Sequence, residues 1–244
     1  MFEQLLSGTK QLPPDTGDVI FYIDMATVKE TINNRPITIS NGAVVSTAQL
    51  IDGKPTLYMP TAGGSGSRLL MNLNPALDLS LTNWTVEWSE YRTANATTWT
   101  NEVYLSDSTL YKGFTMRFGD TGYDNLLMFS DNNNTNGRSE CRINVTRTEH
   151  TGMVVRYAVT CDEARRLRFY INGNLVQIRN GNNSSSSAPL QDYFQSGPAG
   201  NFAALTTLYM GALNNNANNV ARYLGNVRIS NYVRYRGNYT PVPI

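Results

Sequence analysis

The sequence predicts an all-β fold, a sandwich of two antiparallel sheets, and three observations lead to this class. Apolar and polar residues alternate with a period of two in many short segments. Asn, Thr, Ser and Gly crowd the stretches between these segments, which is the turn chemistry of a protein with many short strands. No segment shows a convincing long helical period. The 244 residues fit a single domain, because sandwiches of this length form around one core.

Residues 84–91 show the alternation most clearly, because Trp84, Val86 and Trp88 share one face and polar residues share the other. This pattern predicts a half-buried strand with its tryptophans inward. Residues 114–118 and 166–171 alternate in the same way. Further strands are predicted at residues 19–24, 36–40, 126–130, 205–211 and 223–230, whereas residues 69–81 leave room for a helical turn.

Two hairpins follow from the spacing of these segments. Asn172-Gly173 tolerates the positive φ of a tight turn, so it predicts a hairpin between residues 166–171 and 175–178. Residues 141–147 and 153–161 also alternate, and pairing them would bring Cys141 near Cys161. Two buried thiols are the preferred interpretation, because nothing in the sequence indicates an oxidising compartment.

Composition excludes several classes of function. The formal net charge is +1, so there is no general attraction to nucleic acid or to an anionic membrane. Two cysteines and one histidine are too few for a zinc site of ordinary spacing and remove most catalytic-triad schemes. The first ten residues lack the pattern of a signal peptide, and no apolar run is long enough to span a membrane. We expect a soluble protein without an export signal and without membrane insertion.

The domain organisation is predicted to be an N-terminal arm, residues 1–18, followed by one domain, residues 19–244. Phe2, Leu5 and Leu6 of the arm are apolar and are candidates to dock on a neighbouring protein.

Two segments resemble the concanavalin-A-like and laminin-G-like sandwich family. Residues 150–176 read HTGMVVRYAVTCDEARRLRFYINGNLV, which resembles the family's strand, turn, strand and Asn-Gly hairpin. Residues 208–241 read LYMGALNNNANNVARYLGNVRISNYVRYRGNYTP, which resembles its closing strands. This ending is similar to the jelly-roll sandwiches carried by virion proteins of tailed bacteriophages.

The resemblance implies a non-enzymatic structural protein that decorates a phage capsid, tail or fibre. Its expected partners are other virion proteins and further copies of itself, because virion parts follow symmetry, and its expected location is the virion. The alternative is a carbohydrate-binding lectin or host-adhesion module that contacts a cell-surface glycan. A third hypothesis, a glycoside hydrolase, depends on Glu87 and Glu90, but residues three apart on a strand face opposite ways.

Candidate site residues follow from residue type, and no cofactor is required. Sugar binding needs aromatic platforms with planar polar partners, and the candidates are Trp99, Tyr104, Tyr111, Tyr123, Asn132 and Asn214. Some members of the resembled family use calcium, and the residues that could hold it here are Asp120, Asp124 and Asp131. Outward arginines would form a basic stripe for a protein partner if their strands are neighbours; otherwise they form a solvated face with partners such as Glu87. These arginines are Arg117, Arg142, Arg156, Arg166, Arg168 and Arg228.

Overall fold

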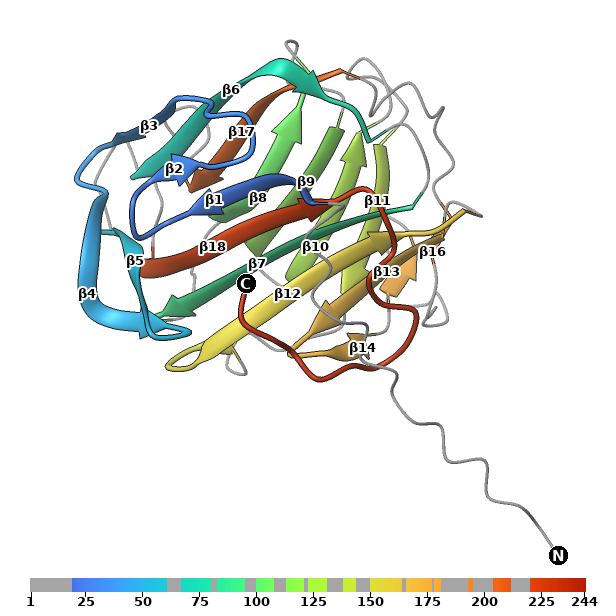
Figure 1. Ribbon diagram of the computed structural model, residues 1–244. Helices are drawn as coiled ribbons and strands as arrows, with labels where there is room; N and C mark the ends of the chain where they lie inside the picture. The colour runs from blue at the N-terminus through green and yellow to red at the C-terminus, as the bar shows by residue number, and fades with distance from the viewer. Residues whose placement is uncertain are drawn as a thin grey trace, which may run out of the picture.

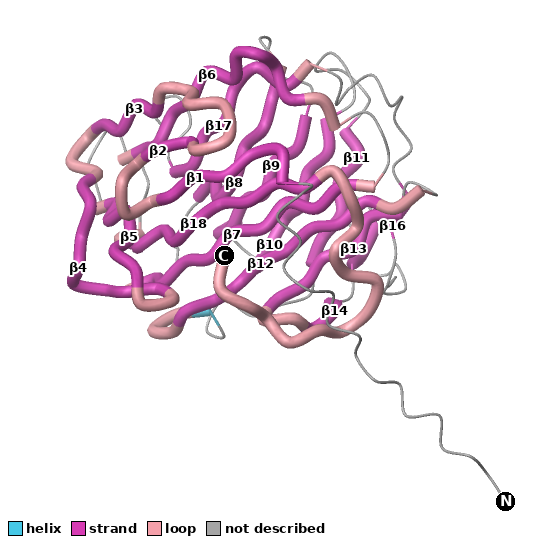
Figure 2. Tube along the Cα trace, viewed as in Figure 1, coloured by secondary structure: helices cyan, strands magenta, loops and turns pink. Residues whose placement is uncertain are grey.

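Two antiparallel β-sheets pack face to face in the computed structural model of this chain (Figure 1). The all-β prediction is confirmed, and nearly every regular element that the structure describes is a strand (Figure 2). No helix in these parts of the chain is long and apolar enough to cross a membrane. The structure describes residues 19–60, 67–79, 83–94, 100–107, 113–120, 123–130, 138–143, 150–163, 166–176, 178–180, 193–194, 204–211 and 220–244.

Sheet A lies at the front of the molecule in Figure 1 and has the order β14-β13-β12-β7-β18-β1-β2. Off this path, β16 pairs with β13, β5 with β18, and β4 with β5. Within the described residues its strands are β1 (Val19–Asp24), β2 (Lys29–Glu30), β4 (Val44–Ile51), β5 (Lys54–Met59), β7 (Trp84–Arg92), β12 (Val154–Cys161), β13 (Arg166–Ile171), β14 (Asn174–Val176), β16 (Tyr193–Phe194) and β18 (Arg222–Ser230).

Sheet B lies behind it and has the order β15-β11-β10-β9-β8-β17-β6-β3. Its strands are β3 (Ile37–Ser40), β6 (Arg68–Leu77), β8 (Thr100–Ser106), β9 (Gly113–Asp120), β10 (Tyr123–Ser130), β11 (Arg138–Ile143), β15 (Ile178–Asn180) and β17 (Leu205–Gly211). The strands predicted around residues 19–24, 36–40, 84–91, 114–118, 126–130, 166–171, 205–211 and 223–230 are therefore confirmed.

The core lies between the sheets and is built by alternate residues of their strands. Trp88 of β7 stacks on Tyr157 of β12 with ring centroids 5.1 Å apart, and Phe169 of β13 completes the cluster. Leu208 and Met210 of β17 are fully buried on the sheet B side. The inward tryptophan face predicted from the alternation is confirmed, because burying these rings supplies the largest apolar area per residue.

The outer face of β7 is buried as well, which corrects the half-buried strand that was predicted. Thr85, Glu87 and Ser89 are at most 3% exposed. The segment after β18, residues 231–244, returns across the outer face of sheet A in front of β12 and β13 (Figure 1). The Thr85 hydroxyl donates to the Tyr232 carbonyl at 2.8 Å. Local alternation could not reveal this cover, because the covering segment is distant in sequence.

The predicted hairpin that would join the two cysteines is wrong. Cys141 lies on β11, which pairs with β10 and β15 in sheet B, whereas Cys161 lies on β12, which pairs with β7 and β13 in sheet A. The pairing of β12 with β7 prevails because it stacks Tyr157 on Trp88 in the core. Cys161 is a buried thiol, as the preferred interpretation expected.

The predicted Asn172-Gly173 turn lies at an edge of sheet A. Asn172 and Gly173 have φ values of 48° and 79° and join β13 to β14, so this predicted hairpin is confirmed. The helical turn for which residues 69–81 left room does not occur in the described residues 69–79, because Arg68–Leu77 is strand β6. Leu69, Met71 and Leu73 are buried on alternate positions of this strand, and this period of two fixes it as β-structure.

Candidate binding surface

Three tyrosines lie side by side across neighbouring strands of sheet A. Tyr58 of β5 is opposite Tyr223 of β18, and Tyr223 is opposite Tyr91 of β7. The ring centroids are 4.8 Å apart between Tyr58 and Tyr223, and 6.1 Å apart between Tyr223 and Tyr91. We call these three residues the tyrosine row.

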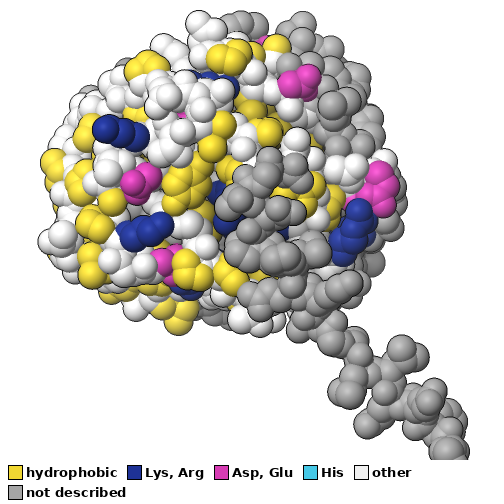
Figure 3. Space-filling model, in the orientation of Figure 1, with side chains coloured by type: hydrophobic (Ala, Val, Ile, Leu, Met, Phe, Trp, Pro, Cys, Tyr) yellow, Lys and Arg dark blue, Asp and Glu magenta, His cyan; other side chains and the backbone are white. Residues whose placement is uncertain are grey.

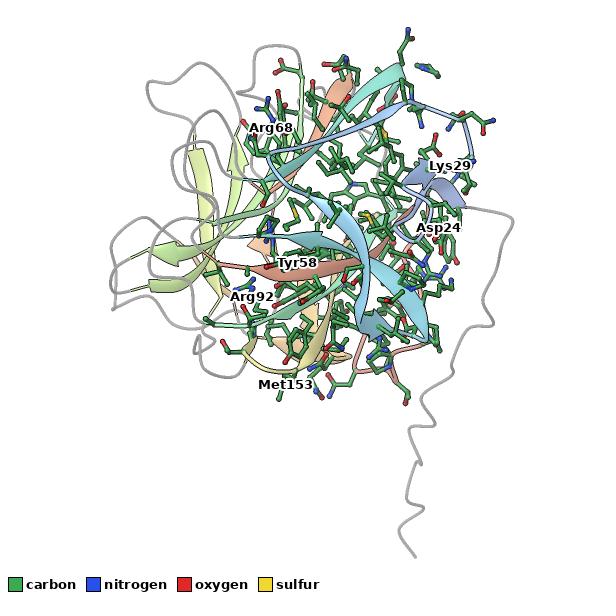
Figure 4. All side chains as sticks on the ribbon, turned by 90° about the vertical axis from the view of Figure 1, so that its left-hand side faces the viewer. Asp24, Lys29, Tyr58, Arg68, Arg92 and Met153 are labelled. Carbon is green, nitrogen blue, oxygen red and sulfur yellow. The ribbon has the colours of Figure 1, made fainter. Side chains whose placement is uncertain are left out.

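The tyrosine row faces away from the core, because the residues next to it along the strand face inward. Leu57 and Met59 on either side of Tyr58 are fully buried in the core, so Tyr58 points to the other face of β5. Each tyrosine of the row is partly exposed. Figure 4 labels Tyr58 in a view from the left-hand side of Figure 1.

The residues that flank the row on the neighbouring strands are apolar. Val44 of β4 lies opposite Tyr58 and is 51% exposed, and Val154 of β12 lies opposite Tyr91. The hydroxyls of the row have no hydrogen-bond partner among the residues that the structure describes. A partly exposed aromatic face with available hydroxyls suits a ligand that is apolar on one side and hydroxylated at its edges.

The acidic residues of the hydrolase hypothesis serve a different purpose. Glu87 is 3% exposed and accepts two hydrogen bonds from Arg228, at 2.8 and 3.0 Å. Arg234 lies 3.2 Å from the same carboxylate, and the Tyr235 hydroxyl donates to it at 2.6 Å. Glu87 is thus the centre of a buried ion cluster that fastens the 231–244 segment to β7.

Glu90 lies on the opposite face of β7 and is also buried among arginines. Arg92 is 2.5 Å and Arg222 is 3.5 Å from its two carboxylate oxygens. A glycosidase needs two carboxyl groups that face one cleft. Glu87 and Glu90 are held on opposite sides of one strand by separate arginine partners, so their geometry does not suit that chemistry.

Tyr235 and Tyr239 of the 231–244 segment stack with centroids 3.5 Å apart and planes at 4°. Burial raises the pKa of both hydroxyls above that of ordinary tyrosine, and the charge of Glu87 raises the pKa of Tyr235 further. The stack rests on Gly173, whose carbonyl accepts a hydrogen bond from the Tyr239 backbone N–H at 2.8 Å.

These raised pKa values predict that the protein loses stability at alkaline pH. Unfolded tyrosine releases its proton near pH ~10, whereas folded Tyr235 and Tyr239 keep theirs. The stabilisation is therefore complete below pH ~10 and is lost as the pH rises through the folded values. Denaturant unfolding at several alkaline pH values should show this decline, and the Tyr235→Phe/Tyr239→Phe double variant should show a shallower one. An equal slope in both proteins would contradict the assignment.

Two of the six glycan candidates predicted from the sequence lie within the described residues, on different strands of sheet B. Tyr104 lies on β8 in sheet B, is 7% exposed and contacts the Tyr209 ring edge to face at 6.2 Å. Tyr123 begins β10. The other four, Trp99, Tyr111, Asn132 and Asn214, lie outside the described residues, so the grouping stays a prediction.

The predicted arginine stripe is divided between the two sheets. Arg117 of β9 and Arg142 of β11 lie in sheet B. Each is opposite Leu126 of β10, which lies between their strands. Arg156, Arg166, Arg168 and Arg228 lie in sheet A. One continuous stripe does not form, because the strands that carry it belong to different layers.

Three of the sheet A arginines have internal partners. Arg228 and Arg168 are at most 8% exposed. Arg228 pairs with Glu87, and Arg168 pairs with Asp162 at 3.1 Å. Arg156 pairs with Asp52. The interface candidates Phe2, Leu5 and Leu6 lie outside the described residues.

Two of the three calcium candidates lie at neighbouring ends of the paired strands β9 and β10. Asp120 ends β9, Asp124 follows at the start of β10, and Asp131 lies outside the described residues. In the parts of the chain that the structure describes, no three His, Cys, Asp or Glu residues gather as metal ligands do. A calcium site stays a prediction.

The tyrosine row was missed because β4 and β5 were not predicted. The sequence carries a signal for them, since Asn41-Gly42 and Asp52-Gly53 bracket the β-branched stretch of β4. All four turn residues adopt positive φ, from 55° to 82°. Such Asn-Gly and Asp-Gly pairs mark tight turns, and applying this rule would have found the β4–β5 hairpin.

No family model and no curated protein sequence matches this chain. Solved structures do resemble it. The botulinum neurotoxin serotype D binding domain has a TM-score of 0.60 and 13% identity, over 88% of this chain and 49% of that chain. The binding domain of Paraclostridial Mosquitocidal Protein 1 has a TM-score of 0.61 and 11% identity, over 88% of this chain and 49% of that chain.

A third structure is the serotype D ligand binding domain in complex with N-acetylneuraminic acid, with a TM-score of 0.61 and 13% identity over 88% of this chain and 48% of that chain. This chain therefore spans about half the length of the structures that it matches. At such low identity the likeness shows the fold alone, a β-sandwich.

Proposed function

We propose that this protein is a non-enzymatic binding module of the lectin-like, concanavalin-A-like kind, and that its tyrosine row contacts a glycan on a cell-surface receptor. The observation that carries the proposal is the row itself. Its three rings are partly exposed, and the centroids of neighbouring rings are 4.8 and 6.1 Å apart. Their hydroxyls have no hydrogen-bond partner among the described residues, so a sugar ring can stack on this surface and hydrogen-bond to it.

Two further observations support binding over catalysis. Glu87 and Glu90, the acidic residues of the hydrolase hypothesis, both form ion pairs with buried arginines. The structural neighbours carry names of binding domains, and one of them is a complex with N-acetylneuraminic acid. A fold is not a function, so the ligand of this chain must be tested directly.

Replacing the central ring tests the proposal. Tyr223→Ala removes the tyrosine that contacts both others, and we expect the affinity for a bound glycan to fall roughly thirtyfold, which corresponds to about 2 kcal/mol for a central aromatic contact. A glycan array that includes sialylated and neutral sugars identifies the ligand, and titration calorimetry gives the affinity.

Tyr209→Ala is the matched control, because Tyr209 also belongs to a cross-strand tyrosine pair but lies on sheet B. Its glycan affinity should equal that of the unaltered protein. Absence of glycan binding, or equal losses in the two variants, would remove the tyrosine row from the proposal.

The place in a phage virion rests on the resemblance of residues 208–241 and stays a proposal beside this one. The two are compatible, since a host-adhesion module of a tail or fibre would bind glycans from within a particle. Labelling the protein in purified particles, followed by electron microscopy, tests its location, its copy number and its contacts with other virion proteins.

A further inference from the structure

Strand β4 differs from the other strands at the edges of the two sheets. The terminal strands β2, β3, β14, β15 and β16 have two to four residues each. Short edges are a common protection against pairing with another chain. β4 has eight residues, and within the described part of the chain it pairs only with β5. Figure 1 shows it along the left margin of the molecule.

The exposed large side chains of β4 are apolar. Val44, Val45 and Leu50 are 51%, 43% and 46% exposed, and they make up three of the five large hydrophobic side chains exposed in the described residues. Residues 36–51 contain no Asp, Glu, Lys or Arg. Figure 3 shows hydrophobic side chains along this margin.

Only the first part of β4 is available for pairing. The register with β5 shifts between Ser46 and Ile51. Within this bulge the Ala48 N–H is hydrogen-bonded to the Ser46 hydroxyl at 3.1 Å, and the Gln49 carbonyl accepts from Thr56 at 2.7 Å. Residues 44–46 precede the bulge, and their outer backbone groups form the free edge.

We infer that this edge pairs with the same edge of a second copy of the chain, antiparallel and about a twofold axis at Val45. In that register Val45 faces its own counterpart, and Val44 faces Ser46 of the other copy. A twofold axis brings each residue close to its own copy, so any charge near the axis would meet a like charge. The uncharged stretch of residues 36–51 removes this repulsion, which is why a second copy fits the edge.

Such a dimer would extend sheet A across both copies and keep both tyrosine rows on one face. Tyr58 and its copy would lie three strand spacings apart across the sheet, about 14 Å, and would be offset by about 7 Å along the strands. Two rows this close would bind one branched or repeated glycan together and raise its apparent affinity. This consequence rests on the proposed function, whereas the dimer itself does not.

Sedimentation equilibrium of the full chain over a range of concentrations tests the pairing. We expect a monomer–dimer equilibrium, and Val45→Lys should raise the dimer dissociation constant at least roughly tenfold, because two ammonium groups would face each other across the axis. Ile32→Lys is the matched control, since Ile32 is also exposed, at 46%, but lies outside β4. Its dissociation constant should stay unchanged.

Hydrogen exchange provides a second measurement that does not depend on a variant. The amides of residues 44–46 should become more protected as the protein concentration rises. A chain that is monomeric at every concentration, or equal weakening in the two lysine variants, overturns the inference. Glycan binding by a monomeric protein would leave the proposed function intact, and a dimer that binds no glycan would leave the pairing intact, so the two failures are distinguishable.

Discussion

Glu87→Ala is expected to lower the free energy of unfolding by about 3 to 5 kcal/mol, which is the cost of breaking a buried ion pair by removing one partner. Arg228 and Arg234 would both lose their carboxylate, and the Tyr235 hydroxyl would lose its acceptor. Arg228 and Arg234 would stay buried and Tyr235 partly buried, each without its carboxylate partner. Denaturant unfolding followed by tryptophan fluorescence measures the loss.

Glu163→Ala is the matched control for this charge. Glu163 pairs with Arg236 of the same segment at 2.8 Å, but both side chains are more than half exposed. Water and salt screen such a pair, so its removal should change stability little. If the two variants are equally stable, the ion cluster at Glu87 does not hold the segment in place.

Gly173→Ala is expected to cost about 3 kcal/mol and to displace the 231–244 segment. Gly173 has a φ of +79°, which L side chains rarely adopt, and a Cβ built there would lie 1.9 Å from the Tyr239 carbonyl oxygen. Positive φ costs roughly 1 to 2 kcal/mol, and forcing extra atoms into a packed site adds about 1 to 3 kcal/mol. Equilibrium unfolding measures the cost, and limited proteolysis followed by mass spectrometry detects release of the segment.

Gly53→Ala separates the two contributions. Gly53 has a similar φ of +74°, but no atom lies within 4 Å of the Cβ position. This variant should therefore show only the backbone cost and should leave the segment resistant to proteolysis. A loss in Gly53→Ala as large as in Gly173→Ala would show that contact with Tyr239 contributes nothing.

The binding surface illustrates why the sequence was a partial guide. Tyr91 and Tyr223 were both assigned to strands, yet nothing local indicates that β7 and β18 are neighbours in register. Tyr58 joins them only because β5 pairs with the first part of β18. The arginines give the opposite case, since alternation placed them on strands and the assignment of those strands to two sheets divided them.

The sequence by itself determined the fold class, most of the strands and the Asn172-Gly173 hairpin, because alternation and turn chemistry act between residues that are close along the chain. Tertiary structure alone decided which strands pair, which face of β7 is covered, and that Glu87 is the centre of a buried cluster. Register and layer are set by burial summed over contacts between distant segments. The hairpin once expected between Cys141 and Cys161 failed for that reason: the better partner for Tyr157 was Trp88, far earlier in the chain.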